Sequence, residues 1–127
     1  MKKVSIKNIK YIPASHENQD KPGVWKKILF RHKDFSPYLR IQMINWAKLP
    51  KGKEFISHYH EDMDEVFIII SGRAEIKIGE EIDTLASGDA VLIPKGIIHQ
   101  MKNIGDEDTH YIVIGASEGK GGKTIIL

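Results

Sequence analysis

The sequence contains no cysteine among its 127 residues. Disulfide bonds, thiolate metal sites and cysteine nucleophiles are therefore excluded, and any metal ion has to be held by His, Asp or Glu. No apolar run approaches the roughly 20 residues that a membrane-spanning helix needs. The first ten residues carry no apolar block of the kind found in signal peptides. We expect a soluble, cytoplasmic protein with no membrane partner.

Charge of one sign is not in large excess, because 19 Lys and Arg stand against 17 Asp and Glu. The basic residues are unevenly placed: residues 1–33 hold nine of them and only two acids. A nucleic-acid-binding arm would have this charge, but here the lysines alternate with apolar residues, as in strands with one solvated face. No pair of DNA-binding helices is evident either. We expect no nucleic-acid partner.

The length, with 41% hydrophobic and 28% charged residues, fits one globular domain. From residue 38 onward, short runs of Ile, Val, Phe and Tyr are separated by Gly, Pro and Asp, with little sign of a 3.6-residue period. This pattern predicts an all-β fold, either a sandwich or a barrel. Strands are expected at 39–49, 54–60, 65–70, 74–78, 90–93, 97–102 and 111–115, and two further ones at 4–12 and 24–31.

The most informative stretch is His58-Tyr59-His60. Residues two apart on a strand point to the same face, with Cα atoms about 6.6 Å apart. Both imidazoles could therefore bind one metal at about 2.0–2.1 Å. Glu65 follows after a short acidic connector that can return the chain as a neighbouring strand. Both faces of that strand are otherwise apolar, and a buried carboxylate needs a partner or a metal ion.

Two stretches of the sequence resemble the two motifs of the cupin superfamily, over about residues 38–115. Ten positions match in order and in spacing: Gly52, His58, His60, Glu65, Gly72, Gly88, Pro94, Gly96, His99 and Asn103. The resemblance implies a double-stranded β-helix, that is, a jelly-roll barrel. It also implies that one metal is held by His58, His60, Glu65 and His99.

The expected organisation is a single cupin-like domain over residues 1–127. Its core barrel covers about 38–115, preceded by N-terminal strands and a loop in 1–37 and followed by a tail in 116–127. Three neutral imidazoles and one carboxylate leave a divalent ion with one net positive charge and, at six-coordination, two open positions. This ligand set does not select the ion, so Mn, Fe, Co, Ni and Zn all remain candidates.

Three apolar residues share strand parity with the ligands and are expected to line a pocket beside the metal: Ile56, Phe67 and Met101. Three other histidines have no partner at ligand spacing and are interpreted as structural: His16, His32 and His110. No general base can be assigned from the sequence. Glu54 and Glu75 are candidates by residue type only.

Two functions remain open at this point. The first is a metalloenzyme that acts on a small polar metabolite, either as a sugar or sugar-phosphate isomerase or as an iron dioxygenase. The second is a cavity that binds or senses a small molecule without turnover. The outward residues Val66, Ile68 and Ile70 need a cover, from the early strands or from a second subunit, and we expect a homodimer.

Overall fold

The computed structural model describes residues 1–119 and 123–127, which form β-strands and two short 3-10 helices. In chain order the strands are β1 (Ile12–Pro13), β2 (Trp25–Arg31), β3 (Ile41–Leu49), β4 (His58–His60), β5 (Asp64–Ser71), β6 (Arg73–Ile78), β7 (Glu81–Ala86), β8 (Ala90–Ile93), β9 (His99–Asn103), β10 (Thr109–Ala116) and β11 (Thr124–Ile126). The helices are η1 (Ile6–Asn8) and η2 (His32–Asp34). Within these described ranges, no helix is long and apolar enough to span a membrane.

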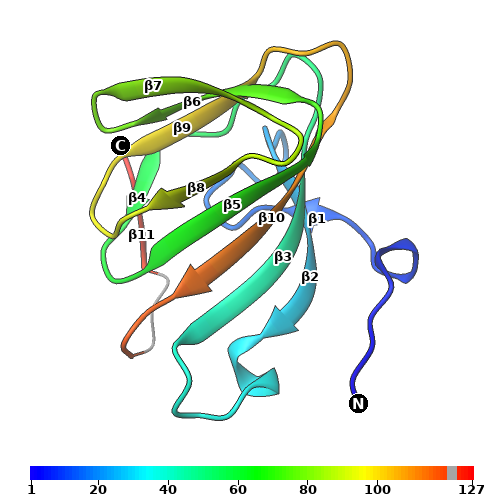
Figure 1. The fold of residues 1–127 in the computed structure, drawn as a ribbon, viewed down its shortest axis with the longest axis vertical. Coiled ribbons are helices and arrows are strands. Elements are labelled where there is room, and N and C mark those ends of the chain that lie inside the picture. The colour runs from blue at the N-terminus through cyan, green and yellow to red at the C-terminus, as the bar shows by residue number, and fades with distance from the viewer. Residues whose placement is uncertain (120–122) are drawn as a thin grey trace.

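The strands form two antiparallel sheets that pack face to face (Figure 1). The six-stranded sheet has the order β1-β2-β3-β10-β5-β8, and the five-stranded sheet has the order β11-β4-β9-β6-β7. From β3 to β11 the chain passes to the other sheet at every connection except β6 to β7. This alternation is that of a jelly-roll barrel, and it confirms the all-β prediction.

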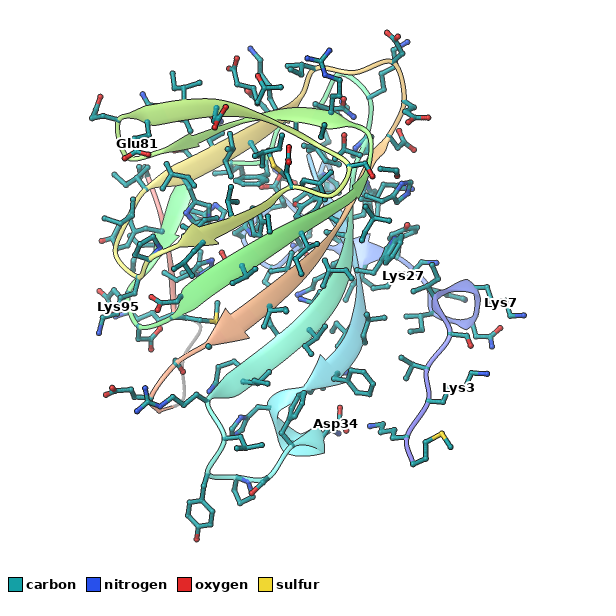
Figure 2. The ribbon with its side chains drawn as sticks, viewed as in Figure 1. Lys3, Lys7, Lys27, Asp34, Glu81 and Lys95 are labelled. Carbon is teal, nitrogen blue, oxygen red and sulfur yellow. The ribbon has the colours of Figure 1, made fainter. Side chains whose placement is uncertain are left out.

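The core lies between the two sheets, to which the strands contribute alternate residues. β10 shows this most clearly, because its eight residues alternate between buried and half-buried positions. Phe67 of β5 and Tyr111 of β10 pack ring against ring in this core, with their centroids 5.0 Å apart. Charged side chains such as Lys3, Glu81 and Lys95 lie on the outside of the molecule (Figure 2).

All seven strands predicted after residue 38 are present; the prediction 90–93 coincides with β8, and the other six differ at one or both ends. The largest shift affects 54–60, where only β4 is a strand and Glu54 makes an isolated bridge with Lys102. The sequence does not predict β7 or β11. Every residue of β7 except Leu85 is exposed, so no apolar alternation marks this strand.

The predicted strand at 4–12 is wrong, since only η1 and the start of β1 stand there. The segment lies along β2 through side-chain contacts. Lys27 Nζ donates a hydrogen bond to the Ile6 carbonyl at 2.6 Å and lies 4.4 Å from the centre of the Tyr11 ring. Trp46 Nε1 donates to the Tyr11 hydroxyl at 3.2 Å. The alternation of lysine and apolar residues therefore reflects side-chain packing and not strand pairing.

The early strands do not cover the outer face of β5. β1 and β2 extend the same sheet, and β3 and β10 lie between them and β5. Val66 and Ile68 are half-buried on that face, and Ile70 is 39% exposed. The expectation that the early strands provide a cover is wrong, and a second subunit is the other cover that the sequence predicts.

Candidate metal centre

The four side chains of the two sequence motifs meet at one place inside the barrel. His58 and His60 lie on the same face of β4, and the cross-strand partner of His58 in β9 is His99. Glu65 reaches them from β5 in the opposite sheet. All four residues are at most 7% exposed. One potential ligand atom from each lies within 4.8 Å of the others, so this group could hold a metal ion.

Backbone hydrogen bonds orient two of the imidazoles. His58 Nδ1 lies 2.6 Å from the Ile56 carbonyl, and His99 Nδ1 lies 3.1 Å from the Ile97 carbonyl. A carbonyl only accepts, so each Nδ1 carries the hydrogen and the neutral ring leaves a lone pair on Nε2. His60 Nδ1 contacts the hydroxyl of Thr124 in β11 at 3.0 Å. Partners of this kind fix metal-binding imidazoles in place.

The remaining atoms of the cluster fit a cation between them. Nε2 of His60 lies 2.8 Å and Nε2 of His99 lies 3.3 Å from Oε1 of Glu65. None of these three buried atoms has a hydrogen-bond partner in acceptable geometry. Lone pairs on nitrogen and oxygen repel one another at this separation unless a positive charge stands among them. The donor set of three imidazoles and one carboxylate therefore suits a divalent transition metal.

The electrostatics keep His58 and Glu65 in their metal-binding protonation states. Burial is the main reason why the pKa of His58 falls to about 3, and the neighbouring rings of His16 and His99 lower it further. Burial alone would raise the pKa of Glu65, but the His60 and His99 rings outweigh this effect and hold the pKa well below its usual range. At neutral pH His58 is therefore neutral and Glu65 is ionised, as metal ligation requires.

Acid is expected to destabilise the metal-free protein. Between pH 6.5, the ordinary pKa of His, and about pH 3, the pKa of buried His58, the unfolded chain binds a proton that the folded chain does not. For each unit by which the pH decreases in this window, the free energy of unfolding should thus fall by about 1.4 kcal/mol. The lowered pKa of Glu65 adds stability above about pH 4.5, which is lost as the pH falls through its folded pKa.

Urea unfolding of chelator-treated protein at pH 7, 6 and 5 measures this dependence. His58→Gln removes the titrating ring and should flatten the curve between pH 6.5 and 5. An unchanged slope in that variant would show that His58 is not held neutral by burial.

A cavity of about 220 Å³ adjoins the cluster. Sites for drug-sized ligands measure about 300–1,000 Å³, so this one suits a smaller molecule. Phe67 lines it, as the sequence predicts, but Ile56 and Met101 do not. Ile56 precedes β4, where strand parity does not hold, and Phe55 takes the inner position. Met101 points inward but is fully buried in the apolar core.

The sequence analysis misses a further residue of this cavity, His16. Its ring stacks on that of His58, with centroids 3.9 Å apart and planes at 19°. His16 Nε2 lies 3.2 Å from Oε2 of Glu17, a buried residue whose carboxylate accepts hydrogen bonds from the backbone N–H groups of Gly23 and Ile56. His16 is not one of the four residues that could hold the metal, but it lies against them and lines the cavity, which the sequence analysis did not predict. The sequence indicates this position of His16 only weakly, by a histidine next to a glutamate in a polar loop.

The other candidates lie away from the cavity. Nδ1 of His32 contacts the Ile41 carbonyl, and His110 contacts Ser71. None of the proposed general bases from the sequence lines the cavity either: Glu54 is exposed, and Glu75 is half-buried on β6. The tail contributes β11, which pairs with β4, while residues 120–122 lie outside the described residues.

Comparison with known proteins assigns the family. The cupin domain family matches residues 45–115, which is more than half of the chain. The chain is 28% identical over 66 residues to the polyketide synthase CurC of Streptomyces cyaneus, a match that covers 52% of this chain and 43% of CurC. The chain spans about half the length of most curated relatives it matches.

Solved structures support the same fold at low sequence identity. A predicted oxalate decarboxylase from Thermotoga maritima has a TM-score of 0.80 at 20% identity, with 91% of this chain and 99% of that chain covered. A cupin sugar phosphate isomerase from Silicibacter pomeroyi has a TM-score of 0.73 at 21% identity, with 91% and 75% covered. The protein belongs to the cupin superfamily and has a group of residues that could bind a metal.

Proposed function

We propose that the protein is a metal-dependent enzyme that converts a small metabolite, with isomerase-like chemistry as the form that the cavity favours. The observation that carries this proposal is His16, which stacks on a metal ligand and lines the same cavity, with the buried carboxylate of Glu17 beside its ring. A site that only stored or sensed a ligand would not need a further imidazole held by a buried carboxylate. The similar structures named as a decarboxylase and an isomerase support a role in small-molecule conversion.

The ligand set would hold one divalent ion, of Mn, Fe, Co, Ni or Zn. Such an ion supplies Lewis-acid polarisation of a carbonyl group or, as iron, a binding position for dioxygen. The chain itself has to provide orientation and proton transfer. Met43, Phe55 and Phe67 provide apolar walls that displace water from the bound molecule.

His16 is the residue that we assign to proton transfer. Nε2 of its ring lies 3.2 Å from a carboxylate oxygen of Glu17, and the ring stacks on His58, so the imidazole is placed beside the metal cluster. Backbone hydrogen bonds and the His16 contact outweigh the effect of burial and lower the pKa of Glu17, which keeps this carboxylate ionised. An isomerase must remove a proton from one carbon and return it to another, and a fixed imidazole can do both.

His16→Gln is expected to lower turnover at least 100-fold, the usual contribution of a general acid–base group, while the metal content stays unchanged. The assay screens sugar phosphates and aromatic ring-cleavage substrates, with Mn(II), Fe(II), Co(II), Ni(II) and Zn(II) in turn. His110→Gln, on the outer face of β10, is the matched control and should retain activity. Oxygen uptake with iron alone would replace the isomerase by a dioxygenase, and binding without conversion under every metal would refute the enzyme.

We also propose that a second copy of the chain covers the outer face of the six-stranded sheet. Cross-strand pairing places these apolar side chains next to one another on that face, each at least partly exposed: Ile44, Val66, Ile68, Leu92, Ile112 and Ile114. No charged residue occupies the paired positions among them. Within this patch two copies can therefore meet without like-charge repulsion, while Lys27 and Lys48 lie on the same face beside it.

Leu92→Lys is expected to weaken the dimer at least 10-fold in sedimentation equilibrium, because a charge then enters the apolar contact. Leu92 is 61% exposed on β8, and Ile82 is equally exposed on β7 of the other sheet. Ile82→Lys is thus a matched control that should leave the dimer intact. A wild-type protein that is monomeric at micromolar concentration would contradict the proposal.

A further inference from the structure

A lysine without an acidic partner lines the cavity. Lys26 lies on β2, and its cross-strand partner is buried Ala47 of β3, so both face the inside of the barrel. Lys26 Nζ donates a hydrogen bond to the hydroxyl of Ser15 at 2.7 Å. None of the ion pairs in the described ranges involves Lys26. Among the described residues that line the cavity, Glu65 is the only acidic one, and it belongs to the metal cluster.

The position of Lys26 disfavours its charge. Burial lowers the pKa of this lysine, and the charge of Arg31 lowers it further. Lys26 is half-buried, the contact of its ammonium group with Ser15 is exposed, and an anion brought to the cavity would supply the counter-ion that this lysine lacks. The metal cluster adds to this effect, because three imidazoles and one carboxylate around a divalent ion leave net positive charge.

A buried amide in the same wall also has unmet hydrogen-bonding capacity. Asn45 is 5% exposed and lines the cavity from β3. Within the described part of the chain, its Oδ1 has no hydrogen-bond partner, and its Nδ2 donates to the sulfur of Met43 at 3.4 Å, a weak acceptor. Buried amides are normally satisfied, so Oδ1 indicates a hydrogen-bond donor on the ligand, such as a hydroxyl group, and Nδ2, which meets a weak acceptor, can donate to an anionic oxygen. Asn45 is two residues from Ala47 on β3, and Ala47 is the cross-strand partner of Lys26. Asn45 is therefore the diagonal neighbour of Lys26 on the same face, and the backbones of such neighbours lie about 7–8 Å apart.

We propose that the cavity binds a small organic anion whose carboxylate or phosphate group contacts Lys26 and Asn45 while its other end reaches the metal cluster. The ammonium group supplies charge, and the amide N–H supplies a directed hydrogen bond. The apolar residues Met43, Phe67 and Val113 form other parts of the wall and suit the carbon skeleton of the ligand. This inference rests on the proposed function in taking the cavity as the substrate site.

Calorimetric titration of the zinc-loaded protein with matched probes tests the inference. Glutarate and succinate are compared with glutaramate and succinamate, in which an uncharged amide replaces one of the two carboxylates. Phosphoglycolate is compared with glycolate, which lacks the phosphate group. At least one charged member should bind 10-fold or more tightly than its analogue. Preference in the carboxylate pairs or in the phosphate pair identifies which anion the site takes. Equal affinities in all pairs would overturn the inference.

Lys26→Met should reduce the preference to less than 2-fold, and Lys26→Arg should preserve most of it. Lys27→Met is the matched control, because Lys27 follows on the same strand and points to the outside, beside the N-terminal segment (Figure 2). Asn45→Asp places a negative charge at the same position and should lower anion affinity at least 10-fold. Zinc content, measured for each variant, should not change. A preference that persists in Lys26→Met would refute the role of this residue.

The outcome is separable from that of the proposed function, because binding and turnover are measured independently. A Lys26-dependent anion preference without turnover would leave this inference standing and refute the enzyme. Turnover without such a preference would leave the proposed enzyme standing and refute this inference.

Discussion

Glu65→Gln is expected to lower the affinity for divalent metal at least 100-fold without unfolding the protein. The carboxylate is the only anionic ligand of the cluster, and the amide that replaces it has the same shape but no charge. Loss of a hydrogen-bonding partner of a metal ligand already costs 10–100-fold in affinity, and loss of a ligand itself should cost more. The new amide N–H can donate to His60 Nε2, which lies 2.8 Å from Oε1 of Glu65. The variant should therefore stay folded without metal, although it lacks the stability that the ionised carboxylate of Glu65 contributes at neutral pH.

Competition with a chromophoric chelator measures the affinity, and thermal unfolding with and without metal measures the linked stabilisation. Glu75→Gln is the control, since Glu75 is half-buried on β6 and does not line the cavity. It should keep the wild-type affinity within 2-fold. Wild-type affinity in Glu65→Gln would show that the carboxylate is not a ligand.

Gly72→Ala is expected to cost about 3 kcal/mol or more of folding free energy, in the range of the most damaging single substitutions. Gly72 joins β5 to β6 at a φ of +93°, where a side chain is disfavoured by about 1–2 kcal/mol. A Cβ at this position would also lie 2.7 Å from Cα of Thr109 and even closer to its hydroxyl. Thr109 is fully buried, and its backbone belongs to β10, so the clash cannot be relieved cheaply.

Gly88→Ala separates the two contributions. Gly88 has nearly the same φ, +92°, but a Cβ there would meet no atom within 4 Å. This variant should lose only the conformational part, about 1–2 kcal/mol. The comparison is made by urea unfolding at pH 7. Equal losses in the two variants would show that contact with Thr109 has no energetic consequence.

The metal cluster can be predicted from the sequence because its geometry is mostly local. Two histidines at strand spacing share a face by construction, and Glu65 follows after a connector too short to carry it far away. The position of His99 opposite His58 is set by the pairing of β4 with β9, which no local pattern encodes. Only the spacing of the second motif, through its likeness to cupins, indicates it.

The rest of the cavity depends on long-range packing that leaves no local signal. His16 reaches the metal cluster because the loop 13–23 returns across it, and Lys26 faces inward because β2 joins β3 in one particular register. Thr124 contacts His60 only because β11 pairs with β4. Ile56 fails as a prediction for the same reason, since strand parity was extended beyond the residues that pair.

The most direct test of the account is anomalous X-ray diffraction from crystals grown with manganese or zinc and measured at the edge of that metal. The account predicts one anomalous peak inside the barrel, at about 2.0–2.2 Å from Nε2 of His58, His60 and His99 and from a carboxylate oxygen of Glu65. An absent peak, or a peak on other side chains with these four residues unligated, would contradict it.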